Sequence, residues 1–291
     1  MNLPTFIIGG AMKSGTTSLH YYLQAHPQVF IPERPQELHF FDIDKNFEKG
    51  FEWYLDHFSP AAPEHMAIGQ TSPVYIYDPK VPSRIAEALP DVKLIFILRN
   101  PVDRAYSHYW HSIKMGSEDL SFEQALEREQ ERIAPGGKPR IAFSYVDRGW
   151  YADQLERYSK HFSRDNMLIL LSENMKKDPS GVIDQCCKFL GVEPRGAWIL
   201  ENLPKKYYNA ARLPRFRTIQ KWIAPYYYRY RKIAEFIANL NLKVARYPPM
   251  SPATRDRLSR RFEEHNQKLA RLYDLDLSPW HEETNYSSPA S

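Results

Sequence analysis

The sequence predicts an α/β fold in which a central parallel β-sheet is flanked by helices on both faces. Short apolar runs alternate along the chain with longer segments of helical periodicity. The runs, such as residues 93–98 (KLIFIL), are short enough to be strands that are buried on both faces. Strands that alternate with helices in this way form a parallel sheet, which binds its ligands at the carboxyl ends of the strands.

The predicted elements follow one another in regular order through the first two thirds of the chain. Strands are expected near residues 5–9, 67–70, 93–98 and 167–171, and helices near residues 16–25, 81–89, 102–114, 122–132, 151–161 and 180–190. Pro101 suits the first turn of a helix, because proline lacks the N–H group that a first turn leaves unbonded. The segment 135–139 (PGGKP) is expected to be a loop.

The segment 5–17 (TFIIGGAMKSGTT) combines a strand, a glycine turn with one lysine, and the start of a helix. The first turn of a helix has unbonded N–H groups and a partial positive charge, and glycines let the backbone approach an anion closely. Lys13 and the hydroxyl groups of Thr16 and Thr17 add a charge and further donors. The segment therefore predicts a site for phosphate or sulfate, the alternative being a turn that only joins a strand to a helix.

Two features distinguish this loop from the magnesium nucleotide site of a P-loop triphosphatase. In the triphosphatase pattern G-x-x-x-x-G-K-[ST], the lysine follows the second glycine. Here Thr16 follows Gly15, and the lysine lies inside the loop at Lys13. The strand at 93–98 ends in Arg99, where such enzymes commonly place an acid that helps to hold magnesium.

Ser107 lies about two helical turns beyond Arg99 on the predicted helix. Both side chains could therefore reach one anionic group at the carboxyl end of the sheet. Cationic and hydroxyl donors gather at a position where a metal site needs carboxylates. This part of the sequence predicts an anion site and no bound metal.

These residues resemble the family of sulfotransferases that use 3′-phosphoadenosine 5′-phosphosulfate, especially its heparan sulfate N- and O-sulfotransferase branch and bacterial relatives. The resemblance rests on residues 13–17 (KSGTT), 35–42 (PQELHFFD), 69–75 (GQTSPVY), 149–155 (GWYADQL), Glu173, 189–192 (FLGV) and, weakly, 262–269 (FEEHNQKL). It implies a P-loop-like three-layer fold. It also implies transfer of a sulfuryl group from that nucleotide to a hydroxyl or amine of an acceptor, for example a glycan, with 3′-phosphoadenosine 5′-phosphate as the product.

The same resemblance implies which residues bind the nucleotide. They are Lys13, Ser14, Gly15, Thr16, Thr17, Arg99 and Ser107. The first five correspond to the family's 5′-phosphosulfate loop, and the last two correspond to its pair of 3′-phosphate ligands. The O-sulfotransferases often carry arginine at the position of Thr17 and lysine near Thr71, so contacts there are expected to be uncharged hydrogen bonds.

The acidic and aromatic motif at 35–42 is expected to supply the acid–base chemistry. The acceptor must lose a proton as it attacks sulfur, and a carboxylate within hydrogen-bond reach can take that proton. Glu37 is the expected base because it occupies the glutamate position of the family motif. His39 shares this role, orients the acceptor, or packs beside its aromatic neighbours, and Asp42 positions other groups. Lys13 is expected to neutralise charge that develops on the bridging oxygen during transfer.

Two other functions are compatible with the motifs. One is a P-loop kinase or nucleotidase with a degenerate phosphate loop, which the position of Lys13 and the arginine at position 99 disfavour. The other is a non-catalytic module that binds anions or carbohydrates on a sulfotransferase scaffold. The presence of both Lys13 and Glu37 disfavours that function.

The composition is consistent with a cytoplasmic enzyme. The formal net charge of +4 suits an anionic ligand and gives no reason to expect nucleic acid as a partner. Cys186 and Cys187 are adjacent and cannot join distant segments. The first strand follows Met1 closely and no apolar stretch reaches the roughly 20 residues of a membrane span, so neither a signal peptide nor a membrane anchor is expected. The acceptor can be a glycan, a lipid or a small molecule, and the sequence gives no indication of the oligomeric state.

The chain is expected to form one domain. Residues 1–192 form its α/β core, and residues 193–291 form a basic and aromatic helical extension that covers the core. The segment 226–232 (YYYRYRK) could cover the nucleotide, contact an acidic acceptor, touch a membrane, or pack as a tyrosine-rich helix with its arginines in solvent.

Overall fold

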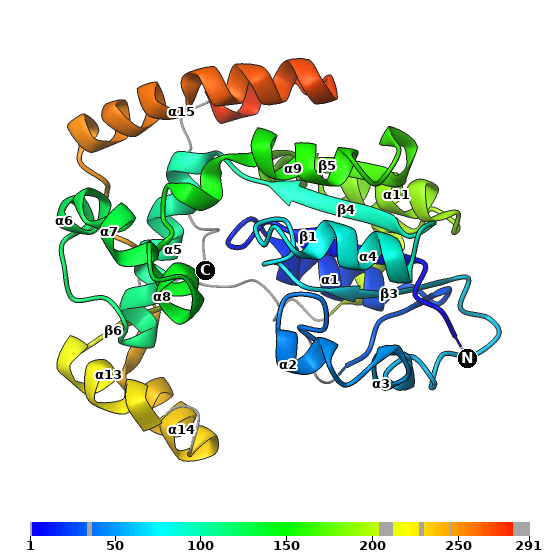
Figure 1. The fold of residues 1–291 in the computed structure, drawn as a ribbon, viewed down its shortest axis with the longest axis horizontal. Helices are drawn as coiled ribbons and strands as arrows, with labels where there is room; N and C mark the ends of the chain where they lie inside the picture. The colour runs from blue at the N-terminus through cyan, green and yellow to red at the C-terminus, as the bar shows by residue number, and fades with distance from the viewer. Residues whose placement is uncertain (1, 34–36, 204–211, 227–229, 245, 282–291) are drawn as a thin grey trace. The chain divides into compact units, whose positions relative to one another are not determined.

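The computed structural model describes residues 2–33, 37–203, 212–226, 230–244 and 246–281, which are drawn as a ribbon in Figure 1. The chain forms two compact units that interleave along the sequence. The first comprises Met1–Arg99, Tyr151–Tyr208 and Lys268–Trp280, and the second comprises Asn100–Trp150, Asn209–Gln267 and His281–Ser291. The expected division at residue 192 follows the order of the chain, whereas these two units do not.

The first unit contains a five-stranded sheet in which every strand pair is parallel. Its strands are β1 (Phe6–Gly10), β2 (Val29–Phe30), β3 (Ala67–Thr71), β4 (Lys93–Leu98) and β5 (Met167–Leu171), in the order β2-β3-β1-β4-β5. The chain leaves β1 towards β2 on one side and later crosses to β4 on the other side. The carboxyl end of β1 therefore lies where the strand order reverses, which is the usual position of a ligand site in such sheets.

Helices cover both faces of this sheet. They are α1 (Thr16–Gln24), α2 (Asp44–Phe47), α3 (Phe51–Asp56), α4 (Val81–Ala88), α9 (Tyr151–Ser159), α10 (Ser172–Lys177), α11 (Pro179–Leu190) and α12 (Gly196–Asn202) (Figure 1). Successive strand residues point to opposite faces, so Ile95 joins a core with α1 and α11, whereas Phe96 joins a second core with α4 and α9. These three layers, with a parallel sheet in the middle, confirm the predicted fold class.

The second unit is mainly helical. It contains α5 (Pro101–Met115), α6 (Phe122–Glu127), α7 (Glu129–Ile133), α8 (Gly137–Phe143), α13 (Arg217–Ile223), α14 (Arg231–Asn241), and an antiparallel pair formed by β6 (Arg212–Pro214) and β7 (Leu242–Val244). The residues of α15 (Pro252–Tyr273) up to Gln267 also belong to it. Asn100 begins α5, because its side chain accepts the N–H of Val102 at 3.0 Å, and α5 then contributes Ala105 and Tyr109 to the core of this unit.

The four predicted strands of the central sheet are confirmed, each within one residue at either end. The helix expected at 122–132 divides into α6 and α7 at Arg128. The loop expected at 135–139 is wrong in part, because residues from Gly137 onward form α8. Gly136 has a φ of 71° at the N-cap of that helix, so glycine begins this helix instead of interrupting it.

A buried ion pair stabilises the second unit. The carboxylate of Glu118 is fully buried, and it accepts hydrogen bonds from Arg132 Nη1 at 2.7 Å and from the Tyr145 hydroxyl at 2.6 Å. Arg128 lies four residues before Arg132 and forms a solvent-exposed ion pair with Glu131. The chain thus offers a buried and an exposed arginine for direct comparison.

We expect Arg132→Met to lower the free energy of unfolding by about 3 kcal/mol, because it leaves the Glu118 carboxylate buried without its cation. Arg128→Met is expected to cost less than about 1 kcal/mol, since its ion pair is exposed. Urea denaturation of both variants measures the difference. Equal losses would contradict the importance of the buried pair.

Candidate anion-binding and catalytic site

The loop that follows β1 is shaped by two glycines. A Cβ on Gly10 would lie 2.4 Å from Cγ2 of Ile76, so that only glycine fits there. Gly15 is the N-cap of α1 and has a φ of 102°, a conformation that other residues rarely adopt. The N–H of Ala11 donates to the Ile97 carbonyl at 2.7 Å, which attaches the loop to the end of β4.

The polar residues of the loop lie around the N-terminus of α1. Ser14 and Thr16 are buried, Lys13 and Thr17 are half-buried, and Lys13 has a φ of 70°. The N–H of Leu19 bonds to the Gly15 carbonyl, so the three amides before it precede the helical hydrogen-bond ladder. The loop therefore presents backbone donors, hydroxyl groups and one lysine at a helix N-terminus, as an anion site requires.

The structure places Arg99 against this loop. Its Nη1 donates to the Lys13 carbonyl at 3.3 Å, and its own carbonyl accepts the Tyr151 hydroxyl at 3.0 Å. Arg99 Nε and Ser14 Oγ are buried, and neither has a hydrogen-bond partner within the described part of the chain. Buried donors without partners are costly, and the acceptor oxygens of bound anionic groups satisfy them. These donors therefore fit phosphate or sulfate groups.

Ser107 belongs to the second unit. It lies on α5 and is buried, with 8% of its surface exposed. The structure does not relate its hydroxyl group to the loop of the first unit, so its pairing with Arg99 stays a prediction.

Glu37, His39 and Asp42 form one hydrogen-bonded cluster. His39 Nε2 lies 3.2 Å from Glu37 Oε2, and His39 Nδ1 lies 2.9 Å from Asp42 Oδ2. Burial lowers the pKa of His39, but the hydrogen bonds and negative charges of Asp42 and Glu37 outweigh it and raise this pKa to about 10. Near neutral pH the ring is thus a cation that donates one N–H to each carboxylate, and it has no lone pair with which to accept a proton.

The aromatic residues of the same motif hold this cluster in place. Phe40 and Phe41 are buried in the core of the first unit, where Phe40 stacks on Tyr54. The N–H of Phe41 donates to the Tyr75 hydroxyl at 3.2 Å, and its carbonyl accepts Arg84 Nη1 at 3.0 Å. The two consecutive buried rings between His39 and Asp42 therefore fix the direction in which the cluster points.

The turn at residues 72–76 connects the cluster to the phosphate loop. The N–H of Ile76 donates to the Gly9 carbonyl at 2.8 Å, and the Ile76 side chain lies against Gly10. Tyr75, the preceding residue, holds Phe41 through its hydroxyl group. The loop and the motif at 37–42 are thus anchored on adjacent residues of one turn, although more than 20 residues separate them in sequence.

Several residues that position the site are not predicted from the sequence. Tyr75 and Arg84 hold the segment at 37–42, and His20 Nδ1 lies 2.9 Å from the Thr71 hydroxyl at the end of β3. Burial lowers the pKa of His20 to about 4, so this ring is neutral. The buried partner of Thr71 is therefore a neutral imidazole. The sequence leaves several roles open for the segment 226–232 (YYYRYRK). Residues 227–229 of this segment lie outside the described residues.

The fold and these donors define a P-loop-like anion site, with a carboxylate–imidazole cluster anchored on the same turn. Residues 3–215 match the sulfotransferase domain family. The bifunctional heparan sulfate N-deacetylase/N-sulfotransferase 4 of Mus musculus is 31% identical over 281 residues, which make up 93% of this chain and 30% of that protein. The heparan sulfate glucosamine 3-O-sulfotransferase 3A1 of Mus musculus is 33% identical over 191 residues, which make up 66% of this chain and 46% of that protein.

Among solved structures, a sulfotransferase from Alicyclobacillus acidocaldarius is similar with a TM-score of 0.72 and 29% identity, over 97% of this chain and 100% of that chain. The chain belongs to the sulfotransferase domain family, and the predicted resemblance is confirmed. The chain spans less than half the length of these two curated relatives.

The raised pKa of His39 makes the folding stability depend on pH in a defined direction. The folded state holds this proton more tightly than the unfolded chain, whose pKa is 6.5. The stability that results is complete below about pH 6.5 and is lost as the pH rises towards 10. We expect the difference in unfolding free energy between wild type and His39→Asn to be larger at about pH 6 than at about pH 10.5 in urea denaturation.

His20→Asn is the matched control of opposite sign: burial lowers the pKa of His20 from 6.5 to about 4, so the unfolded chain takes up this proton near pH 6 and the folded state does not. The stability difference between wild type and His20→Asn is therefore expected to be smaller at about pH 6 than at about pH 10.5. A His39→Asn effect that does not change with pH would show that the imidazolium pair is absent.

Proposed function

We propose that this protein transfers a sulfuryl group from 3′-phosphoadenosine 5′-phosphosulfate to a hydroxyl or amine group of a glycan. The proposal rests on two buried donors, Ser14 Oγ and Arg99 Nε, which have no partner in the described part of the chain. Ser14 lies in the loop after β1, and Arg99 lies at the end of β4. The resemblance to the family assigns both positions to this nucleotide. Membership of the sulfotransferase family supports the same reaction.

The loop holds the sulfate and 5′-phosphate end of the donor. When bound, the donor supplies a sulfuryl group whose bond to a phosphate oxygen breaks during transfer. The amides at the N-terminus of α1, Ser14 Oγ and the hydroxyl groups of Thr16 and Thr17 bind the oxygens of this end. Lys13 stabilises the negative charge that remains on the phosphate oxygen. Arg99 and Ser107 bind the 3′-phosphate, which distinguishes this donor from other adenine nucleotides.

Glu37 is the general base. It takes the proton from the acceptor oxygen or nitrogen while that atom forms its bond to sulfur. His39 is less suited to this task, because a ring with a pKa of about 10 is already protonated near neutral pH. Its N–H groups instead orient the carboxylates of Glu37 and Asp42, which makes His39 a positioning residue. The raised pKa of His39 therefore supports Glu37, and not His39, as the proposed base.

The glycan acceptor is proposed from the relatives, whose names refer to heparan sulfate. The mild positive charge of the chain is compatible with an anionic glycan. A cytoplasmic location stays a prediction that cell fractionation can test. Within the described residues, none of the helices has the length and hydropathy needed to cross a membrane.

The 3′-phosphate contact predicts selectivity between nucleotides. 3′-Phosphoadenosine 5′-phosphate is expected to raise the melting temperature far more than adenosine 5′-phosphate, because a ligand stabilises only the state that binds it. Arg99→Ala is expected to weaken binding of the bisphosphate by about 1.5 to 3 kcal/mol, the value of a hydrogen bond to a charged group. Thermal denaturation measures the first effect, and calorimetric titration measures the second.

Arg195→Ala is the control, since Arg195 pairs with Glu193 at the surface and is expected to leave binding unchanged. Equal stabilisation by the two nucleotides would contradict the assigned 3′-phosphate site. A strict requirement for magnesium in turnover would favour the kinase function.

Glu37→Gln is expected to lower turnover by about 10²- to 10⁴-fold while the donor affinity stays unchanged. The substitution keeps the size and hydrogen-bonding reach of the side chain but removes its basicity. Transfer of labelled sulfate to a heparan-type oligosaccharide measures turnover. Glu33→Gln, at an exposed carboxylate in the same part of the sequence, is the control. Activity of Glu37→Gln within about threefold of wild type would exclude Glu37 as the base.

A further inference from the structure

The helical hairpin formed by α13 and α14 in the second unit exposes an unusual number of large apolar side chains. More than half of the chain's exposed large apolar residues, within the described part, lie between Phe216 and Val244. They include Trp222, which is 68% exposed, and Val244, which is 71% exposed. Scattered apolar residues are normal on a protein surface, but a contiguous group of them indicates an interaction site.

The helix α14 buries small apolar residues and exposes large ones, which is the reverse of the usual arrangement. Ala234 and Ala238 are only 3% and 5% exposed, and the Ala238 carbonyl accepts Gln220 Nε2 of α13 at 3.3 Å. Phe236 and Leu240 lie on the other face and are each 65% exposed. Ile233 lies on the same face and is 62% exposed. Packing within the unit therefore uses the small residues, and the large ones are left for another environment.

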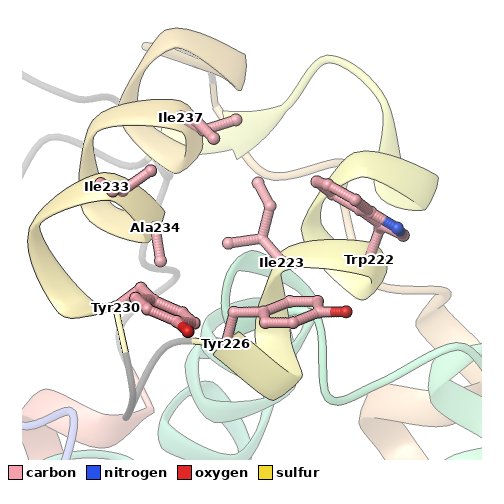
Figure 2. A pocket seen from close by; sticks show the side chains of 7 residues that line it. All are labelled: Trp222, Ile223, Tyr226, Tyr230, Ile233, Ala234 and Ile237. Atoms are coloured by element: carbon pink, nitrogen blue, oxygen red, sulfur yellow. The ribbon is translucent and has the colours of Figure 1, made fainter.

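A cavity of about 300 Å³ lies between the two helices (Figure 2). Ile223 of α13 and Ile237 of α14 point into the space between the two helices, with Tyr226 and Tyr230 at one end of it. Aliphatic and aromatic groups make up nearly all of this lining. The hairpin thus combines an apolar surface with a gap that can take up a further apolar chain.

The same segment of the chain is rich in positive charge. The side chains of Arg212, Arg215, Lys243 and Arg246 are exposed, and Glu235 is the only acidic residue in the sequence from 212 to 246. Lys221 is exposed too, but it pairs with Asp119 at 2.8 Å. A segment that exposes arginines together with Trp, Phe and Leu is typical of helices that lie in the interface of an anionic membrane.

We propose that the α13–α14 hairpin docks on the surface of an anionic phospholipid bilayer. The arginines contact the lipid headgroups, and Trp222, Phe236 and Leu240 enter the boundary between headgroups and acyl chains. An 11-residue helix such as α14 is too short to span a bilayer, so the hairpin lies on the surface. This inference is independent of the acceptor of the sulfuryl group.

Two other occupants fit the observations less well. A sulfated glycan would satisfy the arginines but would leave Phe236 and Leu240 in water. A second copy of the chain would cover the apolar residues, but a symmetric contact through this hairpin would bring two groups of arginines together.

Sedimentation of the full chain with vesicles tests the proposal. Binding is expected to vesicles that contain phosphatidylglycerol, and to be weaker by at least about tenfold with phosphatidylcholine alone. The double variant Phe236→Ser, Leu240→Ser is expected to lose about tenfold or more in vesicle affinity, because each side chain gives up buried apolar area. The double variant Arg215→Gln, Arg246→Gln is expected to lose affinity by a similar factor and to lose part of the salt dependence.

Ile141→Ser and Arg260→Gln are matched controls, since both positions are exposed in the second unit away from the hairpin sequence, and vesicle binding by them should equal that of wild type. Circular dichroism shows whether each variant is folded. A vesicle affinity that the Phe236 and Leu240 substitutions leave unchanged would overturn the proposal. So would heparin binding without vesicle binding, or a dimer in analytical ultracentrifugation that the Phe236 and Leu240 substitutions dissociate.

Discussion

The turn at residues 72–76 is the constraint on which the site of the first unit depends. Its Ile76 amide bonds to the Gly9 carbonyl, and the Ile76 side chain occupies the space beside Gly10 that a Cβ would need. Tyr75 holds the backbone of Phe41 at the same time. A parallel sheet thus positions both the loop after β1 and the motif that carries the carboxylates. Catalysis requires rigid elements of this kind, because reacting groups must be held within narrow limits.

The cluster of Glu37, His39 and Asp42 shows how pairing overcomes burial. Burial alone would make the imidazole neutral, but two carboxylates at 3.2 and 2.9 Å stabilise its charged form. The cation in turn fixes the orientation of both carboxylates, because each N–H of the ring points at one of them. His39 also has a φ of 49°, which is an uncommon backbone conformation for a residue other than glycine.

The two units differ in what they leave exposed. In the first unit the large apolar residues of α1, α4 and α11 face the sheet. In the second unit α14 faces its neighbour with alanines and keeps Ile233, Phe236 and Leu240 outside. A helix of this kind gains little hydrophobic stabilisation from its own fold, so its apolar surface is available to lower the free energy of an association.

The sequence by itself determined the central sheet and the loop. The apolar runs at 93–98 and 167–171 are strands in the structure because they are buried on both faces, which leaves no polar side to interrupt them. The glycines predicted the tight turn before α1, because Gly15 at its N-cap has a φ of 102°, a conformation that other residues rarely adopt. Only the two-residue strand β2 of this sheet had no sequence signal, because pairing with β3 and not composition creates it.

Only the tertiary structure decided which residues act together. The proximity of Arg99 to the Lys13 carbonyl, the anchoring of 37–42 by Tyr75 and Arg84, and the charge state of His39 depend on contacts between segments that are distant in sequence. The grouping of residues 100–150 with residues 209–267 in one unit could not be read from chain order either. Local propensity and periodicity report the environment of a residue within a few positions, whereas a pKa, an ion pair or an exposed face depends on whatever the folded chain brings beside it.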